Sequence, residues 1–271
     1  MIRRLARLPM PLLLAGAFAV AMLIPAVFAV AHGEHVAARA FFYSALLELV
    51  VCLFAAIAVG RFAPAHPAEF HLVSLAASFS VLPLALGLPV MASVGGSWLT
   101  MWFDMVASIT TTGASAYPPG SLPDSVQLWR GIVAWMGGLM VWVAAAAVLT
   151  PLNLGGEELI TRGAVTAEQH RQLRELPGQH HNSLILRHLR LLFPVYALVT
   201  VALWGVLVSL GEHAFPALMR AMATISTSGI LAEAPGQPPA SGMAGELAVA
   251  AFLMLAVSQR LFRPEGMRTR I

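Results

Sequence analysis

Six long apolar stretches constrain this chain more than any other feature of its sequence. A helix that crosses a lipid bilayer needs about 20 mostly apolar residues. The stretches cover about residues 9–31, 40–60, 70–90, 128–150, 187–210 and 243–262. Only 11% of the 271 residues are charged, against about 25% in soluble domains. We therefore predict an all-α polytopic membrane protein, and the composition argues against a soluble enzyme, a nucleic-acid-binding protein and a disordered chain.

The N-terminus has some features of a secretory signal, because three arginines precede the first apolar stretch. That stretch is longer than the apolar region of a signal peptide, which has roughly 7–15 residues. We interpret it as a retained first span, with a cleaved signal as the alternative. The single cysteine, Cys52, lies within an apolar run and excludes a disulfide within the chain.

Two further segments, 97–126 and 212–241, differ from the six spans. Each begins with a short apolar segment and continues into a cluster of Ser, Thr and Gly and then a loop rich in Pro and Gly. This profile is typical of a half-helix that enters the membrane and leaves by the same side, which needs protein or a water-filled cavity around its irregular backbone. The prediction is six transmembrane helices with two re-entrant pore loops.

The arginines support one topology. With a cytoplasmic N-terminus, six spans and both loops entering from outside, thirteen of the sixteen arginines lie on the cytoplasmic side, as the positive-inside rule expects. Arg39, Arg130 and Arg220 are the three outside or near the outer half. Both termini are then cytoplasmic. The cytoplasmic set is Arg3, Arg4, Arg7, Arg61, Arg162, Arg171, Arg174, Arg187, Arg190, Arg260, Arg263, Arg268 and Arg270.

This topology divides the chain into four parts. Residues 1–66 form two peripheral transmembrane helices, and 67–150 form a first helix–pore loop–helix repeat. Residues 151–186 form a cytoplasmic linker of mixed charge, and 187–271 form a second repeat with a short cytoplasmic tail. The linker is either a solvated connector or a docking surface for a cytoplasmic partner, and the sequence leaves both open.

An internal repeat relates the two loops. With Gly113 aligned to Gly229, an offset of 116 residues, the segments Ala-Ser-Ile-Thr-Thr-Thr-Gly and Ala-Thr-Ile-Ser-Thr-Ser-Gly coincide. Four of the seven positions are identical, and the other three exchange Ser and Thr. The flanking elements agree in kind and order, so the same unit occurs twice in the same orientation.

Such clusters have the chemistry of a cation site. Unpaired backbone carbonyls can replace the hydration shell of a cation, as in potassium-channel filters, and hydroxyl oxygens add ligands. Neither cluster contains an acid, which favours a monovalent cation over Ca²⁺ or Mg²⁺. The alternative for one Ser/Thr/Gly run is close helix packing, but two matching runs, each between a half-helix and a Pro-rich exit, favour ion binding.

The residues around these clusters resemble a known family. The stretch Phe103–Ala114, then Leu128-Trp129-Arg130 and Trp135–Gly138, resembles the first filter and following helix of the Trk/Ktr superfamily of bacterial potassium transporters, in its pore-forming membrane subunit. Residues 223–230 resemble the second filter. The ion-binding residues that the resemblance implies are Thr110, Thr111, Thr112, Gly113, Ser226, Thr227, Ser228 and Gly229, with K⁺ at Thr111, Thr112, Thr227 and Ser228.

The resemblance also implies a function and partners. It implies transport of K⁺, and sometimes Na⁺, across the bacterial inner membrane, through four repeats around a pseudo-fourfold axis. It further implies a cytoplasmic nucleotide-binding regulatory subunit. This chain matches only two of the four repeats, the N-terminal half, and two loops cannot encircle an ion. We therefore expect a homodimer or a second chain that supplies the other half. The alternative is a non-conducting remnant or membrane scaffold.

Several other polar residues bear on this interpretation. Asp104 is expected to attract cations at the outer mouth, because the family often has an acid there; the alternative is a hydrogen bond to nearby backbone. Arg220, at the equivalent place in the second repeat, is expected to point away from the axis or to pair with an acid such as Glu212. Glu48 is expected to be packed or protonated within its span. We find no catalytic motif, and predict no enzyme activity, no cofactor and no nucleic-acid partner.

Overall fold

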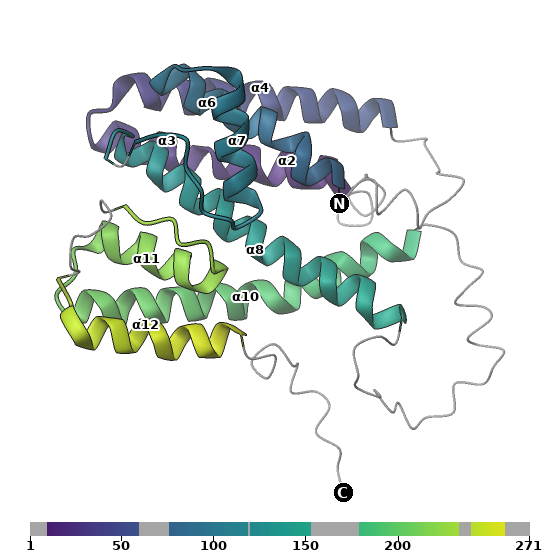
Figure 1. Ribbon diagram of the computed structural model, residues 1–271. Helices are drawn as coiled ribbons and strands as arrows, with labels where there is room; N and C mark the ends of the chain where they lie inside the picture. The colour runs from purple at the N-terminus through teal and green to yellow at the C-terminus, as the bar shows by residue number, and fades with distance from the viewer. Residues whose placement is uncertain (1–9, 60–75, 119, 153–178, 233–239, 258–271) are drawn as a thin grey trace, which may run out of the picture.

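The computed structural model describes residues 10–59, 76–118, 120–152, 179–232 and 240–257, and their regular structure is entirely helical (Figure 1). Most of the predicted linker, residues 153–178, lies outside the described residues. The helices are α2 (Met10–Ala21), α3 (Leu23–Ala31), α4 (His35–Val59), α6 (Leu82–Val94), α7 (Trp98–Ile109), α8 (Asp124–Leu152), α10 (Gln179–Ser209), α11 (Ala214–Ser226) and α12 (Gly242–Val257).

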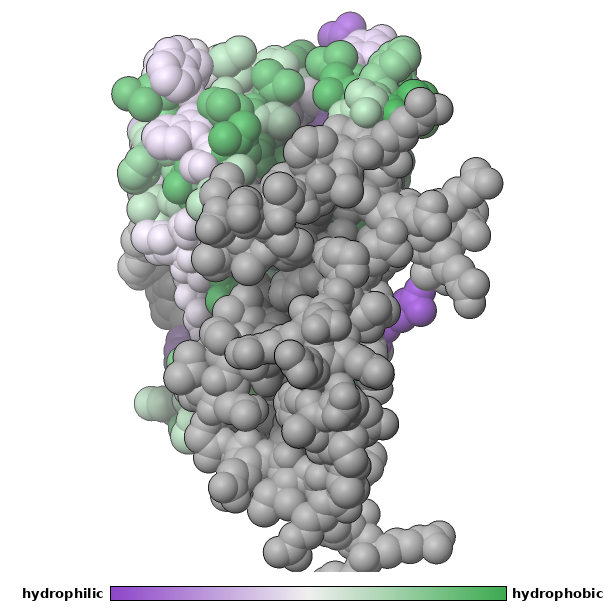
Figure 2. Space-filling model, turned by 90° about the vertical axis from the view of Figure 1, so that its right-hand side faces the viewer, coloured by the Kyte–Doolittle hydropathy of each residue, from purple (hydrophilic) through white to green (hydrophobic). Residues whose placement is uncertain are grey.

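Five helical segments are long and apolar enough to cross a membrane. They are Pro11–Ala31, His35–Ala58, Ala76–Val94, Asp124–Val143 and Leu189–Ser209, and they match the first five predicted stretches. The sixth stretch corresponds to the shorter apolar helix Gly242–Leu255, and its residues 258–262 lie outside the described residues. Large apolar side chains face outward on these helices, among them Val27, Phe54 and Ile57. The coloured surface in Figure 2 is accordingly mostly green to white, as expected of a lipid-facing exterior.

The first span has one interruption. The regular helix breaks at Met22 between α2 and α3, three residues before Pro25, while Met22 keeps helical dihedrals (φ −58°, ψ −22°) and the span continues to Ala31. A proline has no backbone N–H to donate to the preceding turn, so it interrupts the regular ladder of hydrogen bonds there. A turn at Gly33, whose φ is +76°, then returns the chain into α4, and α4 packs along both α2 and α3.

The N-terminal hairpin is attached to the rest of the chain through Glu34. Its carboxylate accepts hydrogen bonds from the backbone N–H groups of Asp124 (3.2 Å) and Ser125 (3.3 Å) and from the Ser125 hydroxyl. These amides belong to the first turn of α8, where N–H groups lack partners within the helix. Glu34 thus caps α8, and the helix begins four residues before the predicted 128.

Helix α8 is the central element of the fold. It packs on α7 of its own repeat and also on α10 and α11 of the second repeat, and Figure 1 shows it between the two groups of helices. Its span is 78% buried, against 22–39% for the other four spans. The second repeat follows the order of the first, with α10, α11 and α12 in place of α6, α7 and α8.

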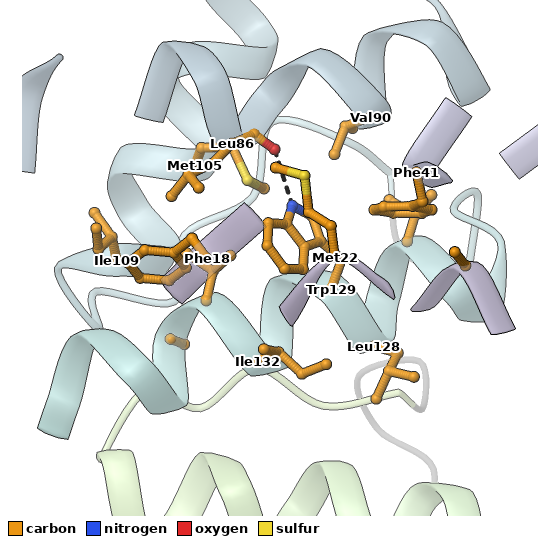
Figure 3. Close-up of a cluster of buried hydrophobic side chains, with 14 of the residues drawn as sticks. Phe18, Met22, Phe41, Leu86, Val90, Met105, Ile109, Leu128, Trp129 and Ile132 are labelled. Atoms are coloured by element: carbon orange, nitrogen blue, oxygen red, sulfur yellow. Dashed lines mark hydrogen bonds between the residues drawn. The ribbon is translucent and has the colours of Figure 1, made fainter. Parts of the chain in front are cut away.

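The core beside α8 is built around Trp129 (Figure 3). The side chain is fully buried, and its indole N–H donates to the Leu86 carbonyl oxygen at 2.9 Å. Phe18 and Phe41 approach the ring edge-on, with centroids at 6.4 and 6.0 Å. This one side chain therefore joins the N-terminal hairpin, α6 and α8, and fixes the frame from which α7 and its loop extend.

Candidate functional site

Helices α7 and α11 begin in the same way. Each follows a glycine with positive φ, Gly95 at +78° and Gly211 at +97°, which are 116 residues apart. Each then starts after an extended residue, Ser97 or His213, and the Ser97 hydroxyl accepts from the Thr100 N–H at 3.1 Å. The helices have 12 and 13 residues. At about 1.5 Å per residue they are shorter than the hydrocarbon core of about 30 Å.

The first loop cluster (Thr110–Gly113) and the second loop cluster (Ser226–Gly229) share one backbone conformation. Thr111 and Thr227 have φ values of 56° and 57°, and they are the only non-glycine residues with positive φ among those the structure describes. Gly113 and Gly229 have φ values of 74° and 67°. A threonine in this region is strained by about 1 kcal/mol or more. Two strained threonines at equivalent positions indicate that the repeat conserves this geometry.

The hydrogen bonds of the two clusters also correspond. In each cluster, the hydroxyl of the first residue bonds the backbone carbonyl four residues earlier. The same hydroxyl also bonds the hydroxyl two residues later. In the first loop cluster the Thr110 hydroxyl donates to the Val106 carbonyl (2.7 Å) and lies 2.9 Å from the Thr112 hydroxyl. In the second, the Ser226 hydroxyl bonds the Met222 carbonyl (2.8 Å) and the Ser228 hydroxyl (3.0 Å). The exchange of Thr for Ser therefore leaves the network unchanged.

The structure brings the two loop clusters into contact. A Cβ added to Gly113 would lie 1.9 Å from the Ser228 carbonyl oxygen. Both clusters also lie against α8, since a Cβ on Gly137 would lie 2.1 Å from the Ile109 carbonyl oxygen and one on Gly138 would lie 3.1 Å from the Ser226 Cβ. The end of α7 and the start of the second loop cluster thus lie beside neighbouring glycines of α8, and the two loop clusters are in contact with each other. Thr112, Thr227 and Gly229 are exposed there.

Asp104 differs from its predicted role. The side chain is fully buried and its carboxylate pairs with the Arg130 Nε at 2.8 Å. The carboxylate also accepts from the Ser115 hydroxyl at 3.1 Å. This arrangement disfavours the expected attraction of cations at the outer mouth, because Arg130 balances the charge of Asp104 and the surrounding protein excludes water from it.

Arg220 and Glu48 agree with what was expected of them. Arg220 pairs with Glu212 at 2.7 Å, as predicted, and also with Glu246 at 2.6 Å. Glu48 is 8% exposed, and neither of its carboxyl oxygens has a hydrogen-bond partner among the described residues. Among those residues no group of three or more His, Cys, Asp or Glu side chains could hold a metal ion.

Comparison with known proteins shows similarity to one group of transport proteins. No family model matches the chain. The chain is 39% identical over 83 residues to the Trk system potassium uptake protein TrkI of Halomonas elongata and 30% identical over 133 residues to TrkH of Escherichia coli K12. A match of 186 residues to TrkH of H. elongata covers 66% of this chain at 28% identity. Over these segments, the chain is similar to Trk potassium uptake proteins.

A solved Trk structure supports the fold. The crystal structure of the potassium transporter TrkH from Vibrio parahaemolyticus superposes with a TM-score of 0.69 over 94% of this chain, at 21% identity. With the five apolar helices, this indicates a multi-pass membrane protein. The chain covers 49% of that structure, and its matches span 16%, 25% and 36% of the Trk relatives named above. The names of these relatives describe potassium uptake proteins.

Sequence reasoning missed two ion pairs, one that joins α7 to α8 and one that joins α11 to α12. The repeat offset contained the signal. Adding 116 to 104 and 130 gives 220 and 246, so Asp104 and Arg130 correspond to Arg220 and Glu246. Opposite charges that exchange places between two copies of a repeat predict that the two positions are in contact.

Proposed function

We propose that this chain carries monovalent cations, K⁺ first and Na⁺ second, across the bacterial inner membrane through its two loop clusters. The ion would lose its water to backbone carbonyl and hydroxyl oxygens of residues 110–113 and 226–229, with K⁺ at Thr111, Thr112, Thr227 and Ser228. The names of the Trk relatives support K⁺ as the ion. No cofactor takes part in this mechanism.

One observation carries the proposal. Two loops that are 116 residues apart have the same left-handed threonine and glycine and lie in contact, with exposed residues in both. A left-handed residue rotates its peptide groups out of the helical direction, which frees carbonyls for an ion. Helix packing alone does not require the same strained residue twice.

The membrane topology belongs to the proposal. It has six spans, cytoplasmic termini and two re-entrant loops, and its parts are 1–66, 67–150, 151–186 and 187–271, as the sequence predicts. The shortness of α7 and α11 supports the re-entrant loops. Cysteine accessibility labelling from each side of the membrane tests this directly. Labelling of Ser97→Cys and Ser121→Cys from opposite sides would overturn it.

A partner completes the pore in this proposal, because two loops cannot surround an ion. Helix α12 has an exposed apolar face that such a partner would cover. Its Leu247 and Met254 are 65% and 69% exposed. Their equivalents in α8, Gly131 and Gly138, contact α11. The partner is a second copy of this chain or a chain that supplies the other repeats, and a nucleotide-binding subunit on the cytoplasmic side would regulate the pore.

The test is K⁺ uptake in a bacterium that lacks its own potassium uptake systems. Gly113→Asp and Gly229→Asp are compared with the unmodified chain at equal membrane amounts. Gly205→Ala is the control, because a Cβ on Gly205 meets nothing within 4 Å. We expect both Asp variants to abolish uptake and the control to keep it. Equal uptake in all four strains contradicts the filter assignment.

Measurements on the purified chain then distinguish a homodimer, a pore completed by a second chain and a non-conducting scaffold. Its mass in detergent distinguishes a monomer from a dimer, and K⁺ flux in liposomes measures conduction. A conducting dimer supports the homodimer. A silent monomer that conducts only with a second chain supports the complementary half, and a chain that is silent in both conditions supports a non-conducting scaffold.

A further inference from the structure

The same two positions form an ion pair in each repeat, with the charges exchanged. Asp104 in α7 pairs with Arg130 in α8 at 2.8 Å, and Arg220 in α11 pairs with Glu246 in α12 at 2.6 Å. Each pair joins the pore half-helix to the helix that follows the loop, across 26 residues. In both repeats the half-helix residue lies nine positions before the glycine of the loop cluster.

We propose that these pairs are two copies of one positioning device that sets the geometry of the loop clusters. The inference rests on the proposed function, because the geometry that it sets is that of the proposed filter. The four residues are positioning residues, since they act on the ion through the loop and do not touch it.

The exchange of charges distinguishes this role from cation attraction. A residue that attracts cations by its field must keep a negative sign, but the position of Asp104 is occupied by Arg220 in the second repeat. A link between two helices needs only opposite charges at a fixed separation. The link is conserved between the repeats and its polarity is not.

The first pair also holds the loop directly. The Asp104 carboxylate accepts a hydrogen bond from the Ser115 hydroxyl at 3.1 Å, only two residues after Gly113. The Arg130 guanidinium is held in turn by the Gln127 side-chain oxygen at 2.9 Å. Since the pair is buried, water does not compete with it, and the loop exit is fixed relative to α8.

The second pair is built differently around the same link. Arg220 also bonds Glu212, and Glu212 accepts from the Ser241 hydroxyl at the start of α12. Glu246 is 54% exposed, whereas Asp104 is fully buried. We therefore expect the first pair to be the more sensitive of the two, and it is the one to test.

The experiment exchanges the charges of the first pair to match the second. Asp104→Arg and Arg130→Glu are made singly and together, in a Cys52→Ser chain with Ala116→Cys as a reporter in the loop. The maleimide labelling rate of residue 116 measures the loop without any transport. Asp124→Arg is the control, because it makes the same change of charge at an exposed residue.

We expect residue 116 to be labelled about tenfold faster in each single variant than in the parent chain. In the double variant we expect a labelling rate within about threefold of the parent rate. The labelling rate does not return fully because an arginine at residue 104 cannot accept the hydrogen bond from the Ser115 hydroxyl. The K⁺-to-Na⁺ uptake ratio, measured in the same variants with Ala116 restored, should fall in the singles and recover in the double. A role in folding alone would lower the membrane amount and leave this ratio unchanged.

The outcomes separate the inference from the proposed function. If the double variant labels no more slowly than the singles, the two residues are not coupled and the inference is overturned. If labelling recovers but the ion ratio never moves, the link exists and does not position the filter, which also overturns it. If the parent chain carries no K⁺, the proposed function fails, and the labelling result still decides whether the link sets the loop.

Discussion

The Gly113 α-carbon lies against the Ser228 carbonyl oxygen, with room for a hydrogen and for nothing larger. A side-chain carbon at residue 113 would be 1.9 Å from that oxygen, whereas the same atom at Gly229 would meet nothing within 4 Å. The two glycines are equivalent in the repeat and both have positive φ. Their surroundings differ, so the same substitution at each glycine tests the two loop clusters separately.

Alanine at these glycines should therefore have unequal effects. At Gly229 only the left-handed conformation opposes the change, at a cost of about 1–2 kcal/mol. At Gly113 the methyl group also meets backbone, which cannot move aside as a side chain does. We expect Gly113→Ala to lower K⁺ uptake at least about tenfold more than Gly229→Ala, a difference worth about 1.4 kcal/mol. Uptake at matched membrane amounts measures this, and equal losses would contradict the contact.

Gly137 and Gly205 provide a second matched pair, now within helices. Replacing an unstrained helical glycine by alanine stabilises a helix by about 0.5–1 kcal/mol, and Gly205 has open space around it. A Cβ on Gly137 would lie 2.1 Å from the Ile109 carbonyl oxygen, at the end of α7. We expect Gly205→Ala to raise the thermal unfolding midpoint in detergent and Gly137→Ala to lower it. Shifts of the same sign in both would show that α7 does not approach α8 this closely.

The capping of α8 by Glu34 predicts a graded loss of stability. Glu34→Ala removes the acceptor for two amides and a hydroxyl in the first turn, which should cost about 1–2 kcal/mol. Glu34→Gln keeps one side-chain oxygen as an acceptor and should lose less stability than Glu34→Ala. Thermal unfolding of the purified protein measures the order. A Gln variant less stable than the Ala variant would contradict a capping role.

Parts of this fold could be predicted from the sequence because they depend on local patterns. The five apolar helices follow from length and hydropathy alone, and the repeat around Gly113 and Gly229 predicted two loops of one kind. The break at Met22 was missed because the hydropathy of the first stretch continues across it, and only Pro25 marked it. The predicted start of α8 was late because its cap comes from Glu34, 90 residues away along the chain.

The pairing of Asp104 with Arg130 was not predicted, for a related reason. A carboxylate in an apolar half-helix has the same sequence pattern whether it faces the pore or a buried arginine. Its partner Arg130 lies 26 residues further along the chain, beyond any local periodicity. The likeness of the two loop clusters was predicted because the repeat doubles their signal. The ion pairs could have been found by comparing charges across the same repeat rather than residue identities alone.

The core around Trp129 gives the last prediction. Trp129→Ala removes a fully buried indole that contacts Phe18, Phe41 and α6, and truncation of a buried Trp costs about 3–5 kcal/mol. Trp129→Phe keeps most of the volume but leaves the Leu86 carbonyl without its donor, at about 1–3 kcal/mol. Trp98→Ala is the control, because Trp98 is 62% exposed. We expect unfolding midpoints in detergent in the order Trp98→Ala, Trp129→Phe and Trp129→Ala, from highest to lowest. Because the ring-contact and hydrogen-bond partners of Trp129 lie in the hairpin and α6, Trp129→Phe should retain the ion preference of the unmodified chain. A changed preference would show that this core also sets the loop clusters.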